Sequence, residues 1–174
     1  MALRMLTAAA VLWVGGLAAA DDILQPVEDL TRPREVRTGR ASSAQEDLSR
    51  NQDNKPIETG QTLVLADIAG PGVITHMWCT VASKDPFYSR SLVLRIYWDD
   101  NEKPSVEAPL GDFFAVGNGA AAEVDSAMVN VTAAGKSRSC YWRMPFHKRA
   151  KITVTCESRQ YRTDSFYFYV DYEK

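Results

Sequence analysis

Apolar and polar residues alternate along most of the chain after residue 57, as in strands that bury one face. The clearest case is FYFYVDY, in which Phe166, Phe168 and Val170 share one side. Eight strands are predicted in this way: Gln61–Ile68, Val73–Val81, Leu92–Trp98, Ser105–Ala108, Met128–Thr132, Cys140–Met144, Lys151–Cys156 and Phe166–Tyr172. Turn-forming Gly, Pro, Asp and Asn residues separate them, and no segment has a convincing amphipathic helical period.

The strand pattern also predicts which strands pair and which residues share a face of the sheet. Cys140–Met144 and Lys151–Cys156 are expected to pair around a connection that holds Pro145. Within the second predicted strand, alternation places Ile74 and His76 on the same face. Because His76 alternates with apolar residues, it is interpreted as a hydrogen-bonded core histidine.

About eight short strands joined by polar turns predict an all-β fold, a jelly-roll-like β-sandwich of antiparallel strands over residues 58–174. Residues 21–57 precede it and are mostly polar, with little periodicity. A polar stretch of this length is either a flexible leader or a functional loop. The sequence therefore predicts a polar leader or loop segment followed by one domain.

The first twenty residues have the pattern of a secretory signal peptide. Arg4 precedes an apolar run, Met5–Ala19, which ends in small alanines before Asp21. The alternative is a membrane anchor, but the run is shorter than the roughly 20 residues that a spanning helix needs. We therefore expect cleavage after residue 20, a secreted or periplasmic protein, and no membrane span in the mature chain.

Composition removes several functional classes. Loss of Arg4 leaves 19 of the 20 basic residues against 22 acidic ones, a net charge of −3. This balance, spread along the chain, argues against a nucleic-acid partner. Cys79, Cys140 and Cys156 lie in strand-like runs and are predicted to be buried thiols rather than a disulfide. Neither their spacing nor the two isolated histidines indicate a metal site, and no cofactor is expected.

Two polar segments are candidates for contact with sugar. Asn51 and Asp53 could present an amide and a carboxylate to hydroxyl groups, although both residue types are also ordinary turn formers. Asp112 precedes Phe113 and Phe114, and a carboxylate beside exposed aromatic rings is a sugar-binding combination. The alternative is a buried Phe pair with Asp112 capping a turn, and residue chemistry alone favours neither. Motifs for a catalytic nucleophile are absent.

Four ordered segments carry a family resemblance: LADIAGPGVITHMW, LVLRIYWDDNEKPSVEAPLGDFFAVGNG, CYWRMPFHKRAKITVT and FYFYVDYEK. Together they resemble the family first described as domain of unknown function 2961, now glycoside hydrolase family 172. Its characterised members act on fructofuranosides and related furanosides. The resemblance runs from about Thr31 to Lys174 and corresponds to the N-terminal half of the family architecture.

The resemblance implies a jelly roll, carbohydrate as the partner, and trimer-based homo-oligomers in the full-length form. It places the family's two catalytic glutamates downstream of the segment matching Phe166–Lys174, so no catalytic residue is assigned in this chain. It also implies that the polar stretch with Asn51 and Asp53, and the LGDFF segment with Asp112, approach the sugar pocket.

Three hypotheses follow from the sequence. The first is the front portion of an exported furanosidase-like hydrolase, inactive by itself. The second is a stand-alone secreted module that binds carbohydrate without cleaving it. The third is a purely structural subunit of an oligomer. The first is favoured, because motif coverage is extensive while no pair of catalytic carboxyl groups is present.

Overall fold

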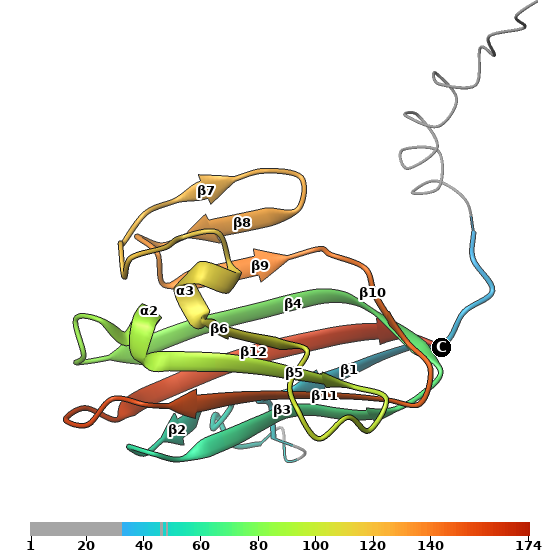
Figure 1. The fold of residues 1–174 in the computed structure, drawn as a ribbon, viewed down its shortest axis with the longest axis horizontal. Coiled ribbons are helices and arrows are strands. Elements are labelled where there is room, and N and C mark those ends of the chain that lie inside the picture. Colours follow the sequence, from blue (N-terminus) through green and yellow to red (C-terminus); the bar gives the residue numbers. More distant parts are fainter. Residues whose placement is uncertain (1–32, 46, 48) are drawn as a thin grey trace, which may run out of the picture. The chain divides into compact units, whose positions relative to one another are not determined.

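The computed structural model describes residues 33–45, 47 and 49–174. The predicted signal peptide, residues 1–20, and the first part of the polar segment lie outside these residues. From Val36 to Lys174 the chain forms one compact unit, a sandwich of two antiparallel sheets (Figure 1). The predicted all-β sandwich is therefore confirmed.

The larger sheet has eight strands. In spatial order its main path is β1 (Thr38–Ser42), β12 (Thr163–Glu173), β4 (Gly72–Ser83), β9 (Ser137–Cys140), β8 (Val129–Thr132) and β7 (Val124–Asp125). Two short strands add to it: β2 (Lys55–Ile57) pairs with β12, and β10 (Met144–Phe146) pairs with β4. The smaller sheet has the order β3 (Thr62–Ala69), β11 (Arg149–Cys156), β5 (Leu92–Trp98) and β6 (Val106–Pro109).

The inward faces of the two sheets form one hydrophobic core. In β5 the predicted alternation holds, and Leu92, Leu94 and Ile96 are fully buried. In β12, Phe166 and Phe168 likewise face inward, with 0% and 4% of their surface exposed. The period-two pattern succeeds here because both strands lie inside their sheets, where one face always meets the opposite sheet.

The sandwich begins earlier than residue 58. β1 and β2 both lie in the segment predicted as leader, and both pair with β12. Their patterns contain too few apolar positions to stand out, because edge strands of a sheet are short and polar. The loop of residues 43–54 that joins them therefore starts and ends on the same neighbouring strand.

The predicted pairing of Cys140–Met144 with Lys151–Cys156 is wrong. Cys140 is the last residue of β9 and Met144 is the first residue of β10. Both of these strands pair with β4. β4 is twelve residues long, so its edge has room for β9 beside Met77–Thr80 and for β10 beside Gly72–Ile74. β11 lies instead in the other sheet, between β3 and β5.

A β-bulge changes which residues of β4 face the core. Asp171 lies opposite His76, whereas Tyr172 lies opposite Ile74, so Thr75 is an extra residue in the ladder. Ile74 is therefore fully buried, while His76 points outward with 21% of its side chain exposed. The prediction that the two share a face, with His76 in the core, is wrong for this reason.

Two short helices lie toward one end of the sandwich, α2 (Tyr88–Ser91) and α3 (Leu110–Phe113) (Figure 1). The three cysteines are free and buried, as predicted. Burial raises the pKa of Cys79 to about 12, so its thiol stays protonated and unreactive. Among the residues that the structure describes, no helix is long and apolar enough to span a membrane.

Candidate functional site

The loop of residues 43–54 holds the first two predicted sugar-contacting residues, Asn51 and Asp53. Its start is fixed by Ser43, whose backbone N–H donates to the Phe168 carbonyl at 3.1 Å and whose hydroxyl accepts from the Phe168 N–H at 3.1 Å. Asn51 and Asp53 themselves are exposed. Both side chains are thus free to meet a ligand beside β12.

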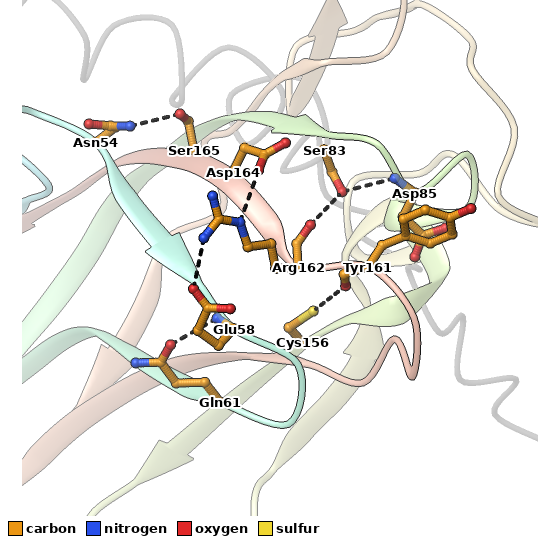
Figure 2. A network of polar contacts seen from close by, with 10 residues as sticks. All are labelled: Asn54, Glu58, Gln61, Ser83, Asp85, Cys156, Tyr161, Arg162, Asp164 and Ser165. Carbon is orange, nitrogen blue, oxygen red and sulfur yellow. Dashed lines mark hydrogen bonds and ion pairs between the residues drawn. The ribbon is translucent and has the colours of Figure 1, made fainter.

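A polar network fixes the far end of this loop (Figure 2). The Asn54 amide donates to the Ser165 hydroxyl at 2.7 Å. Close by, the Arg162 guanidinium contacts the carboxylates of Glu58 and Asp164, each at 3.2 Å. The network therefore ties the loop and β2 to the start of β12, so the exposed residues before Asn54 leave from a fixed point.

The same network continues to the short helices. The Ser83 hydroxyl donates to the Arg162 carbonyl at 3.1 Å and accepts from the Asp85 N–H at 3.1 Å. The Asp85 carboxylate then accepts from the Phe87 N–H at 2.8 Å and from the Ser91 hydroxyl at 2.6 Å, which fixes the start and end of α2. A chain of hydrogen bonds thus connects Glu58, which follows β2, to α2.

Asp112, the third predicted residue, is held by α2. The Arg90 guanidinium donates to its carboxylate at 2.5 Å, and 35% of the Asp112 side chain is exposed. Asp112 is therefore accessible, but one of its oxygens is already paired. No direct contact joins Asp112 to Asn51 or Asp53 among the described residues; the polar network links their supporting elements instead.

Phe113 and Phe114 are buried, with 8% and 1% of their surface exposed. Their rings meet edge to face at 5.0 Å, and Phe113 makes a similar contact with Trp142 at 5.3 Å. Of the two alternatives for this segment, the structure has the buried pair. Neither ring offers a face to a sugar in this domain, so the expectation of exposed rings at LGDFF is corrected.

Two aromatic rings lie side by side on the outward face of β4 and β12. Trp78 and Tyr169 are cross-strand neighbours and stack at 4.8 Å between ring centroids. Arg40 covers the other side of the Tyr169 ring at 4.4 Å. The signal was present in FYFYVDY, which carries aromatic residues on both faces of one strand.

A row of interacting polar side chains crosses the sheet beside these rings. The Arg40 guanidinium donates to both Asp171 carboxylate oxygens, at 2.5 and 3.1 Å, and His76 Nδ1 lies 2.9 Å from Oδ2. The His76 ring stacks on Tyr141 at 4.9 Å, and its Nε2 is buried without a hydrogen-bond partner. Only pairing across three strands brings these distant residues together.

The ionisable groups show a common trend. In the described part of the chain, each carboxyl group whose pKa departs from its ordinary range is shifted downward: Asp47, Asp67, Asp85, Asp99 and Asp171. The shifts follow from hydrogen bonds and arginine partners, which favour the charged form over the opposing effect of burial. These carboxylates are suited to accepting hydrogen bonds rather than to donating a proton. Nor do the described residues contain a cluster of three metal-ligating side chains.

Acid should weaken the Arg40–Asp171–His76 row. Burial alone would raise the pKa of Asp171, but hydrogen bonds from Arg40 and His76 outweigh it, so the pKa lies below its ordinary value. A lowered folded-state pKa stabilises the protein above the ordinary value of about 3.9, and this stability is lost as pH falls through the folded value. We expect the melting temperature to fall more steeply below about pH 4 in the wild type than in Asp171→Asn. Parallel curves for the two proteins would contradict this assignment.

Fold and surface together define the class of this protein: an antiparallel β-sandwich module with a polar loop and an aromatic outer face. The family model for the GH172 first beta-sandwich domain matches residues 34–174. The chain therefore belongs to glycoside hydrolase family 172 and represents its first β-sandwich domain, which confirms the resemblance seen in the sequence. No curated protein matches the chain significantly.

Proposed function

We propose that this chain is the N-terminal jelly-roll portion of an exported glycoside hydrolase that acts on furanosides of the fructofuranoside type. The family match over residues 34–174 is the observation that carries the proposal, since it supports a glycoside hydrolase module. Export is supported by the pattern of residues 1–20. Assembly into homo-oligomers remains part of the proposal and follows from the resemblance alone.

The catalytic carboxyl groups are proposed to lie outside this sandwich. Hydrolysis of a glycosidic bond requires one carboxyl group as general acid, with a raised pKa, and a second as nucleophile or base. The shifted carboxyl groups of the described residues have lowered pKa values and are held by arginines or backbone N–H groups. None of these shifted groups has the raised pKa that the general acid needs. The role proposed for this domain is to shape the substrate site.

Asn51, Asp53 and Asp112 are the proposed substrate contacts. Asn51 and Asp53 extend from a loop with fixed ends, and Asp112 is held in place by Arg90. A carboxylate accepts hydrogen bonds from sugar hydroxyls, while an amide both donates and accepts. Asp112 is fixed before binding and therefore loses little conformational entropy when it binds.

The proposal is tested with chromogenic fructofuranosides and with ligand-observed NMR on the purified chain. We expect no hydrolysis above the buffer rate, together with weak binding that falls about tenfold in an Asn51→Ala/Asp53→Ala variant. Asp47→Ala, in the same exposed loop, is the matched control and should bind like the wild type. Hydrolysis by the chain alone would disprove the assignment of the catalytic pair to another part of the protein.

The stand-alone binding module makes the same prediction for the isolated chain, so a second observation is needed. Sequencing the gene through the Lys174 codon distinguishes the two. An in-frame continuation with two glutamate-containing motifs is expected from the hydrolase proposal. A stop codon at that point would favour the binding module.

A further inference from the structure

An open hollow of about 420 Å³ lies where β1, β12 and β4 adjoin one another. Its volume is within the range of about 300–1,000 Å³ typical of small-molecule sites. It is lined by Thr38, Gly39, Arg40, Thr75, Asp171 and Tyr172. None of these residues belongs to the loop or to the LGDFF segment that the sequence singled out.

The charged pair in this hollow is held in place from several sides. The two carboxylate oxygens of Asp171 accept from Arg40, and His76 Nδ1 lies 2.9 Å from Oδ2. Arg40 also lies over the Tyr169 ring, which in turn stacks on Trp78. Because both charged groups are fixed before a ligand arrives, little entropy is lost on binding.

The lining retains unused hydrogen-bonding capacity. A guanidinium has five N–H donors, and Arg40 uses two of them on Asp171. A carboxylate has about four acceptor positions, of which three are occupied at Asp171. The Thr75 hydroxyl donates to the Asp171 carbonyl at 3.3 Å and can still accept. Donors and acceptors therefore converge on the same small space.

The Tyr172 ring packs over Gly39 on the inward side of the sheet, because Tyr172 lies opposite the buried Ile74. A Cβ atom at position 39 would lie 2.3 Å from Cζ of Tyr172, so any larger residue would displace the ring. Close packing of an aromatic side chain over a glycine in a neighbouring strand is a recognised way to complete a sheet edge. Here it fixes the edge strand β1 against β12, next to the Arg40–Asp171 pair.

We propose that this hollow binds one neutral sugar residue of a glycan, in addition to the contacts made by the loop of residues 43–54. Arg40 and Asp171 cancel in charge, so an anion would be opposed by Asp171 and a cation by Arg40. Sugar hydroxyls both donate and accept, which matches the mixed lining of Arg40, Asp171 and Thr75. The inference rests on the proposed sugar function and adds a binding position to it.

The test is a two-dimensional amide NMR titration of the full chain with methyl β-D-fructofuranoside, and with galacturonate and glucosamine as charged comparisons. We expect the neutral furanoside to shift the amide signals of Gly39, Thr75 and Tyr172. Arg40→Lys keeps the charge but loses the planar fork, and should weaken binding about tenfold. Arg149→Lys is the matched control, because Arg149 makes the same two-oxygen contact with Asp67 on the other sheet.

A second variant, Thr75→Val, keeps the shape and strand preference of the residue while removing its hydroxyl, and should also weaken binding. Shifts confined to Asn51, Asp53 and Asp112 would overturn the hollow as a sugar site and leave the proposed function intact. An absence of shifts anywhere would contradict both. Equal shifts at Gly39 and Tyr172 with a charged sugar would overturn the requirement for a neutral ligand.

Discussion

Replacement of Phe166 with alanine should lower the free energy of unfolding by about 3–5 kcal/mol, the usual cost of emptying a buried phenylalanine site. Phe166 is fully buried on the inward face of β12. β12 pairs with β1, β2 and β4, and the Phe166 ring lies 6.2 Å from that of Phe168. A cavity here cannot close easily, because the strand is held on both edges.

Urea unfolding followed by fluorescence measures this loss, and Tyr167→Ala provides the matched control on the next residue of the same strand. Tyr167 faces outward opposite Thr80, so its replacement should cost about 1 kcal/mol, as cross-strand pairs do. An equal loss in the two variants would mean that the inward and outward faces of β12 are assigned wrongly. Because each variant loses an aromatic ring, the difference between their free energies of unfolding reports the effect of burial.

Asp85→Ala is expected to cost about 2–3 kcal/mol, since it leaves buried donors without their charged acceptor. Only 7% of Asp85 is exposed, and its carboxylate accepts from Phe87 and Ser91 at the two ends of α2. Although burial opposes ionisation, the hydrogen bonds from Ser91, Phe87 and Ser158 lower the pKa of Asp85. The carboxylate is therefore charged at neutral pH.

Hydrogen exchange on α2 provides the decisive measurement for Asp85→Ala. The variant should exchange the amides of α2 faster and loosen the Arg90–Asp112 ion pair, whereas distant β-strands keep their protection. Asp47→Ala is the matched control, because Asp47 accepts from the backbone and hydroxyl of Ser49 but lies in an exposed loop. It should leave stability almost unchanged. If both variants behaved alike, burial would not be the source of the effect.

The two outer faces of the sandwich differ in chemistry. On the smaller sheet, Arg95 pairs with Glu107 and Glu157, and Arg149 pairs with Asp67 and Asp100. Such exposed ion pairs suit contact with water. The larger sheet instead carries the stacked Trp78–Tyr169 pair and the Arg40–Asp171–His76 row on its outer side. Sheets with one solvated face are normally polar there, so this aromatic face is the better candidate for contact with a ligand.

The sequence by itself determined the all-β class and the inward residues of the central strands. β5 was predicted with the same bounds that it has in the structure, and β12 with the right face inward. Such strands are specified locally, since burial on one side imposes a period of two on the residues themselves. The family was also identifiable from the sequence, because its motifs are long and ordered.

Tertiary structure decided what depends on neighbours from elsewhere in the chain. The alternation in β4 could not reveal that Thr75 forms a bulge, because the bulge is defined by pairing with Asp171 and Tyr172. Nor could the sequence show whether the rings after Asp112 are exposed, since the same residues suit a core or a surface. The hollow between Arg40 and Asp171 joins positions 131 residues apart. Register between strands, which only the folded chain fixes, brings those two side chains into contact.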